Sequence, residues 1–123
     1  MVDTINDVGV YRLTDGGPVL GSYTSATDLI GELYGLAADM IVIPAARLDT
    51  EFFRLGSGVA GAFIEKLQQY GLRLAIVGDI DAIMETSAAL QDFVRETNRH
   101  GYHLFVRDEA DLVERLRRQG AVV

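Results

Sequence analysis

Residues 40–79 read MIVIPAARLDTEFFRLGSGVAGAFIEKLQQYGLRLAIVGD, and the order of patterns in this stretch decides the fold. The stretch opens with the apolar run 40–44 and closes with a second apolar run, 72–77. Between them lie a polar loop and a helical pattern that starts after Ser57 and stops at Gly71. Strand, loop, helix and strand in this order form a βαβ unit, whose two strands run parallel. The stretch therefore predicts an α/β fold.

The same reasoning extends to the rest of the chain. Residues 41–43 are β-branched without polar alternation, which predicts a strand buried on both faces. Residues 8–13 alternate like a strand, and Asp15-Gly16-Gly17 predicts a hairpin that leads into a short second strand at 18–20. A last strand is expected at 102–106. These patterns predict one domain over residues 1–123, with a mixed, mostly parallel sheet of about four to five strands and about four helices.

Helices are expected between the strands. The first is capped by Ser25 or Thr24 and carries an inward face of Leu29, Ile30, Leu33, Tyr34 and Leu36. A single helical turn capped by Asp49 or Thr50 is expected in the long loop before Ser57. Its Phe52 and Phe53 cannot share one direction, so one of the two is expected to stay partly exposed. Further helices are expected after Ser87 and after 108–111.

Composition excludes several kinds of protein. The chain has 123 residues, is 49% hydrophobic and carries a net charge of −7, which argues against binding to nucleic acid or to an anionic membrane surface. Its apolar runs are far shorter than the roughly 20 residues that cross a bilayer, and residues 1–7 do not resemble a signal peptide. The chain has no cysteine, which fits a cytoplasmic location.

The expected site lies beyond the carboxyl ends of the parallel strands, where α/β proteins bind ligands. The connections at that edge carry Arg47, Asp49 and Phe52, then Ser57 with Gly58, and then Asp79. Ser57 stands at a predicted helix start, where backbone N–H groups favour a bound anion or a phosphate on the serine itself. The alternative is a plain helix-capping serine. The glycines beside it do not form a P-loop, because the Gly-Lys-Ser/Thr ending is missing.

Other polar residues have structural explanations beside functional ones. Asp79 and Asp81 form either an acid pair or a magnesium site, or else they cap the next helix. His100 and His103 suggest a metal, but one ends a helix, the other begins a strand, and the sequence offers no third ligand. The sequence thus predicts no catalytic residue, no metal and no cofactor.

Several motifs resemble a bacterial family of small proteins known as DUF4180, over nearly the whole chain. The resembling stretches are DLIG at 28–31, IVIP at 41–44, RLD at 47–49 with Phe52-Phe53, LAIVGD at 74–79 and FVRETN at 93–98. That family is similar in fold to STAS domains, which include the anti-sigma factor antagonists. STAS antagonists carry an Asp-Ser-Ser-Gly loop that a partner kinase phosphorylates on serine. Here the matching residues are Leu55-Gly56-Ser57-Gly58, so the resemblance implies a docking surface at this loop and makes Ser57 the candidate for phosphorylation.

Three functional hypotheses follow. The first is a non-enzymatic, STAS-like regulatory module that docks an unidentified protein through the surface around Asp49, Phe52, Ser57 and Asp79; a homodimer is left open. The second is a sensor of a nucleotide or another small anion at the same edge. The third is an enzyme in which Asp79 with Glu96 or His103 supplies acid–base groups, which requires a concave pocket.

Overall fold

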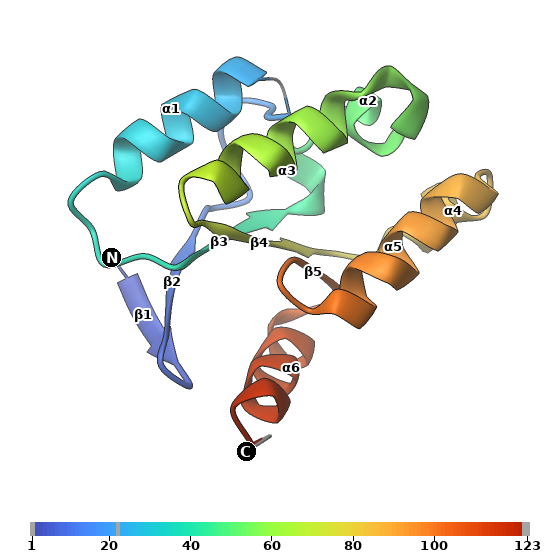
Figure 1. The fold of residues 1–123 in the computed structure, drawn as a ribbon. Helices are drawn as coiled ribbons and strands as arrows, with labels where there is room; N and C mark the ends of the chain where they lie inside the picture. Colours follow the sequence, from blue (N-terminus) through green and yellow to red (C-terminus); the bar gives the residue numbers. More distant parts are fainter. Residues whose placement is uncertain (1, 22, 122–123) are drawn as a thin grey trace.

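A five-stranded sheet forms the centre of the protein in a computed structural model that describes residues 2–21 and 23–121 (Figure 1). The strands lie side by side in chain order. The first strand runs antiparallel to the second, and the other four run parallel to one another. The sheet is thus mixed and mostly parallel, as predicted. The strands are β1 (Val2–Ile5), β2 (Val8–Arg12), β3 (Met40–Pro44), β4 (Arg73–Val77) and β5 (Leu104–Val106).

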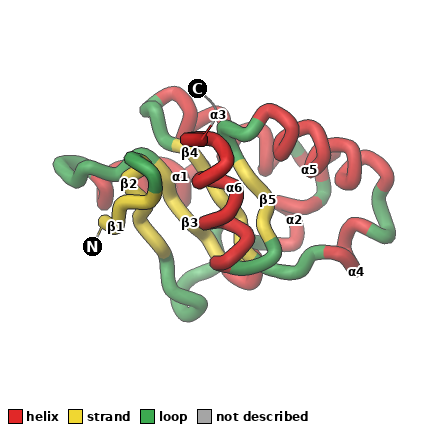
Figure 2. The backbone as a smooth tube through the Cα atoms, turned by 90° about the horizontal axis from the view of Figure 1, so that it is seen from below, coloured by secondary structure: helices red, strands yellow, loops and turns green. Residues whose placement is uncertain are grey.

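Helices cover both faces of this sheet. Helices α1 and α3 lie next to each other over one face in Figure 1, and α6 crosses the opposite face, as the view in Figure 2 shows. Helix α5 lies beside β5. The helices are α1 (Tyr23–Leu33), α2 (Thr50–Phe53), α3 (Val59–Gln69), α4 (Asp81–Met84), α5 (Ala88–His100) and α6 (Glu109–Ala121), with 3₁₀ turns η1 (Ala45–Arg47) and η2 (Leu55–Ser57).

Strand β3 confirms the prediction of a strand that is buried on both faces. Ile41 and Ile43 belong to the core beneath α1, α3 and α5, whereas Met40 and Val42 belong to the core beneath α6. Alternate residues of a strand point to opposite faces, so a strand between two helical layers needs an unbroken apolar run. Met40 pairs with Arg73 and Pro44 with Val77, and this parallel register completes the βαβ unit.

The hairpin lies elsewhere than predicted. Strands β1 and β2 form it, with a two-residue turn at Asn6 and Asp7, whose φ angles of 50° and 68° suit a tight turn. The segment at 15–20 forms no hairpin, and Leu20 makes a single bridge to Leu48. The physical reason is Arg47, whose guanidinium binds the carbonyls of Thr14 and Pro18 and holds this loop.

The inward face of α1 is shorter than predicted. Leu29 and Leu33 are buried, but Tyr34 is 91% exposed and Leu36 also faces solvent. The helix begins at Tyr23 and ends at Leu33, and Gly35 follows with a φ of 85°. Residues beyond the last helical turn no longer follow the 3.6-residue period, so the spacing of Tyr34 and Leu36 carried no information about their burial. Because α1 begins at Tyr23, Ser25 does not cap it.

Candidate binding sites

The loops that leave the carboxyl ends of the parallel strands carry the residues predicted to form a site. Asp49, Ser57, Gly58 and Asp79 are exposed there, and we call these four residues the rim. Arg47 and Phe52, which were predicted to join them, are buried. The prediction is therefore wrong about the accessibility of two of its six residues.

Ser57 ties together the segments on either side of it. Its hydroxyl oxygen lies 2.7 Å from the carbonyl oxygens of Glu51 and Arg54, to which it donates, and it accepts the Val59 N–H at 3.2 Å. Ser57 is not the N-cap of α3, as one interpretation had it. That position belongs to Gly58, whose φ is 78°, because the chain must reverse between η2 and α3. Glycine reaches this left-handed conformation without steric cost.

Asp49 and Phe52 mark the single turn of α2. The Asp49 carboxylate caps this turn by accepting the Glu51 N–H at 2.9 Å, as predicted. Phe52 and Phe53 are both buried, so the expectation that one stays partly exposed is wrong. Their rings meet edge to face at 5.4 Å, and Phe52 meets Phe63 of α3 at 5.7 Å. Helix α2 contacts both α3 and η2, so Phe52 and Phe53 are buried although they point in different directions.

Arg47 is a structural residue. Its side chain is only 9% exposed, and all its hydrogen bonds among the described residues go to the backbone carbonyls of Thr14 and Pro18, at 3.0–3.2 Å. A cation fixed in this way supports the loop before α1. It is not presented to a ligand at the rim.

Charge pairs join the connection after β4 to the connection after β5. Arg107 lies 3.0 Å from Asp81, and its backbone N–H donates to Asp111 at 3.1 Å. Arg115 also pairs with Asp111 at 3.1 Å. These residues line a cavity of about 140 Å³. The carboxylate of Asp79 caps the following turn by accepting the Asp81 N–H at 3.0 Å. Since arginines already neutralise Asp81 and Asp111, this edge offers no acid pair.

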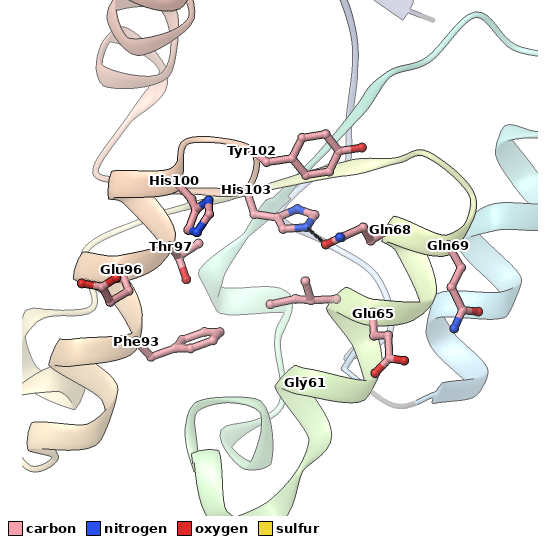
Figure 3. Close-up of a pocket in the computed structure, with 11 residues that line it drawn as sticks. Gly61, Glu65, Gln68, Gln69, Phe93, Glu96, Thr97, His100, Tyr102 and His103 are labelled. Carbon is pink, nitrogen blue, oxygen red and sulfur yellow. Dashed lines mark hydrogen bonds between the residues drawn. The ribbon is translucent and has the colours of Figure 1, made fainter.

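A larger concavity, which sequence reasoning missed, lies between α3 and α5 (Figure 3). We call it the groove. Its volume is about 680 Å³. Ile64 on α3 and Phe93 on α5 supply apolar surface to its two walls, and polar side chains and further aromatic rings complete the lining. The lining residues are Gly61, Ile64, Glu65, Gln68, Gln69, Phe93, Glu96, Thr97, His100, Tyr102 and His103.

His103 occupies a fixed position in the groove. Its Nδ1 accepts the Leu74 N–H at 3.0 Å, so this nitrogen carries no proton. The proton of the neutral ring is therefore on Nε2, which donates to the Gln68 side-chain oxygen at 3.0 Å. Burial and the nearby Arg73 guanidinium lower the pKa of His103 to about 4. The ring is thus neutral at pH 7.

This position separates the groups of the enzyme hypothesis. His103 precedes β5 at the amino end of the parallel strands, whereas Asp79 follows β4 at their carboxyl end. Glu96 lines the groove with His103, whereas Asp79 does not line it. The proposed acid–base pairs with Asp79 are therefore wrong. His100 lies in the groove too, but residues 2–21 and 23–121 contain no cluster of three metal-binding side chains.

The signal for the groove was present but scattered. Ile64 and Phe93 stand at the helical spacing of a core face, and each of the two histidines has a structural explanation of its own. Only the spacing between α3 and α5 unites them, and no local pattern encodes that spacing. Ile64 and Phe93 are only half-buried because the space between α3 and α5 leaves them open to the groove.

The fold and these two regions define an α/β protein with a hairpin-led, mostly parallel sheet. A family model described as a domain of unknown function, DUF4180, matches residues 5–116, and the chain belongs to this family. No curated protein and no solved structure matches the chain. Within the described part of the chain, no helix has the length and apolar character needed to span a bilayer.

Proposed function

We propose that this protein is a cytoplasmic, STAS-like regulatory module of bacterial origin that binds a partner protein through the rim and has no enzymatic activity of its own. The observation that carries the proposal is the exposure of Asp49, Ser57 and Gly58 before the start of α3 and of Asp79 after β4. None of these residues lines the groove or the smaller cavity. An accessible polar surface without a described cavity suits a protein partner better than a small molecule.

Phosphorylation of Ser57 is part of this proposal. A phosphate on the hydroxyl would face the carbonyl oxygens of Glu51 and Arg54, which now accept its hydrogen bond. Two acceptors repel a phosphate, so modification would release η2 from these contacts. The exposed Arg54, now paired with Glu51 at 2.6 Å, is the nearest guanidinium in sequence that can compensate the new charge. The modification would therefore change the shape of the rim as well as its charge.

Affinity capture from a lysate of the source organism, quantified by mass spectrometry, tests the proposal. Asp79→Lys reverses a charge on the rim, and Ser57→Glu adds one. Glu32→Lys is the matched control, because Glu32 is an exposed acid on α1 that makes no ion pair among the described residues. The proposal predicts proteins that the wild type and Glu32→Lys retain and that both rim variants lose. Equal recovery with all four proteins would contradict it.

A second copy of the chain is one candidate for the partner at the rim. Light scattering after size-exclusion chromatography distinguishes it from a different protein. If the wild type and Glu32→Lys are dimers while Asp79→Lys is a monomer, the rim is a homodimer interface. If all are monomers, the partner must be another protein.

A nucleotide or anion sensor at the same edge has less support. Arg47 at that edge already binds carbonyls and is buried, and Arg107 after β5 is paired with Asp81 at 3.0 Å. Thermal-shift measurements with nucleotides and phosphorylated metabolites test the sensor directly. A rise in melting temperature that Ser57→Glu abolishes and Glu32→Lys preserves would favour the sensor over the protein-binding module.

A further inference from the structure

We propose that the groove between α3 and α5 binds a small organic cation, an amine or quaternary ammonium compound with an apolar body. This site is separate from the rim and does not depend on the proposed function. The inference rests on the charge of the groove, its aromatic lining, its volume and the way in which its two walls are held apart.

Charge favours a cation in the groove. Glu65 and Glu96 lie on its two walls, and no lysine or arginine of the described residues is among those that line it. Glu96 pairs with Arg99 at 2.8 Å on the outer side of α5, but Glu65 makes no ion pair among the described residues. The protein as a whole carries a charge of −7. An anion entering the groove would meet the Glu65 carboxylate, whereas a cation gains an ion pair with it.

Aromatic rings supply the second feature. The side chains of Phe93, His100, Tyr102 and His103 all line the groove. The Arg73 guanidinium already lies over the Tyr102 ring at 5.5 Å, which leaves the other three rings for a ligand. The faces of aromatic rings attract organic cations, and this attraction strengthens where water is excluded. Ile64 adds an apolar surface between them. The combination of rings, apolar surface and carboxylates favours a cation with an apolar body over a strongly hydrated metal ion.

The groove is held open by fixed contacts. The Asn98 side chain binds both the N–H and the carbonyl of Phe105, at 2.7 and 3.1 Å, which fixes α5 against the outer edge of β5. Arg73 binds the carbonyls of Gly101 and Tyr102 at 2.7–2.8 Å and fixes the turn after α5. Helix α3 packs on α1 instead. Because each wall is anchored away from the other, the groove exists before a ligand arrives.

The volume suits a small molecule. Sites for such ligands measure about 300–1,000 Å³ and combine an apolar lining with a few oriented polar groups. The groove has about 680 Å³. Its oriented polar groups are Gln68 and His103, whose mutual hydrogen bond fixes both side chains.

Two pairs of variants test the site. Gly61→Leu fills the groove, because Gly61 is an exposed helical glycine that lines it and has open space around its Cβ position. Gly31→Leu is its control, with the same open space on α1. Glu65→Gln removes the free carboxylate, and Glu32→Gln makes the same change outside the groove. The probe is benzyltrimethylammonium, with benzenesulfonate as an anion of similar size, and binding is followed by amide chemical shifts.

The proposal predicts saturable shifts that cluster on α3, α5 and residues 102–103. Gly61→Leu should weaken binding about tenfold or more, and Glu65→Gln should weaken it about two- to fivefold, as expected for one partly solvated ion pair. Gly31→Leu and Glu32→Gln should bind like the wild type. Shifts spread over the acidic surface, equal binding of benzenesulfonate, or equal effects of each variant and its control would each overturn the proposal. Absence of saturable binding to the wild type would overturn it as well.

Discussion

Two rim residues, Ser57 and Gly58, directly precede α3, and α3 itself forms one wall of the groove. The polar side chains of the two regions nevertheless have different roles. At the rim, Asp49, Ser57 and Asp79 each accept a hydrogen bond from a backbone N–H within two residues of themselves. In the groove, the residues come from segments far apart in the chain, and the Glu65 carboxylate makes no ion pair with any residue that the structure describes. Local sequence therefore accounts for the rim as a set of helix starts and turns. The groove has no such local explanation, and a ligand is the simplest use for it.

The largest expected effect concerns Phe52, which was predicted to join the rim but is buried in the core. Phe52→Ala should lower the free energy of unfolding by about 3–5 kcal/mol, since it removes a ring that is 1% exposed. Urea unfolding measures the change. Tyr34→Ala is the control at a ring 91% exposed, and it should change the free energy by less than about 0.5 kcal/mol. Equal, small changes would mean that Phe52 is accessible and belongs to the rim after all.

The next largest effect concerns Arg47, which was predicted to join the rim but is buried. Arg47→Ala should cost about 2–3 kcal/mol of unfolding free energy, because it leaves the carbonyls of Thr14 and Pro18 without their donors. Arg54→Ala removes an exposed arginine that pairs with Glu51, and it should cost less than about 1 kcal/mol. Chemical denaturation of both variants gives the two values. If Arg47→Ala leaves stability unchanged but abolishes anion binding, Arg47 is a ligand-binding residue of the rim.

His103 makes the free energy of unfolding depend on pH. Its pKa falls from the ordinary 6.5 to about 4 on folding, so the unfolded chain binds a proton more readily between these values. The neutral His103 ring therefore contributes its full share of folding stability above pH 6.5, and this share is lost as the pH falls towards 4. Discounted for the partial exposure of the ring, it amounts to about 1–2 kcal/mol.

The comparison of wild type with His103→Asn isolates this effect, because carboxylates titrate alike in both proteins. Unfolding free energies at pH 7 and pH 4.5 should differ more in the wild type than in the variant. The resonances of the His103 ring should also titrate near pH 4. Identical pH profiles would show that the ring is as solvated as in the unfolded chain, and the groove would then be more open than its hydrogen bonds indicate.

Much of the fold was predictable, because it depends on patterns within single segments. The apolar run at 40–44, the stop at Gly71 and the cap at Ser87 each mark an element that the structure contains. The predicted hairpin failed because Gly16 and Gly17 resemble a tight turn as much as Asn6 and Asp7 do. What decided between them was the burial of Arg47 against the 14–18 loop, a contact across some thirty residues.

The same limit applies to the sites. The rim residues lie at the carboxyl ends of the strands as predicted, because the order of elements determines that edge, and their role in binding stays a prediction. The burial of Arg47 and Phe52 and the existence of the groove both depend on how helices pack. Sequence spacing shows which face of a helix is apolar, but not how far that face stands from the next helix.

Two glycines on either side of the start of α3 give the smallest expected effects, and these should have opposite signs. Gly58 belongs to the rim and has a φ of 78°, so Gly58→Ala should cost about 1 kcal/mol of unfolding free energy. Gly61 belongs to the groove and lies within α3, with nothing near its Cβ position, so Gly61→Ala should add about 0.5–1 kcal/mol. Thermal and urea unfolding measure both. Space is open around both glycines, so only the backbone conformation distinguishes them, and changes of the same sign would mean that α3 begins elsewhere. Ser57 and Gly58 of the rim precede the first residue of α3, and the groove is lined by the turns that follow it. The left-handed backbone of Gly58 therefore marks the boundary between the rim residues before α3 and the turns of α3 that line the groove.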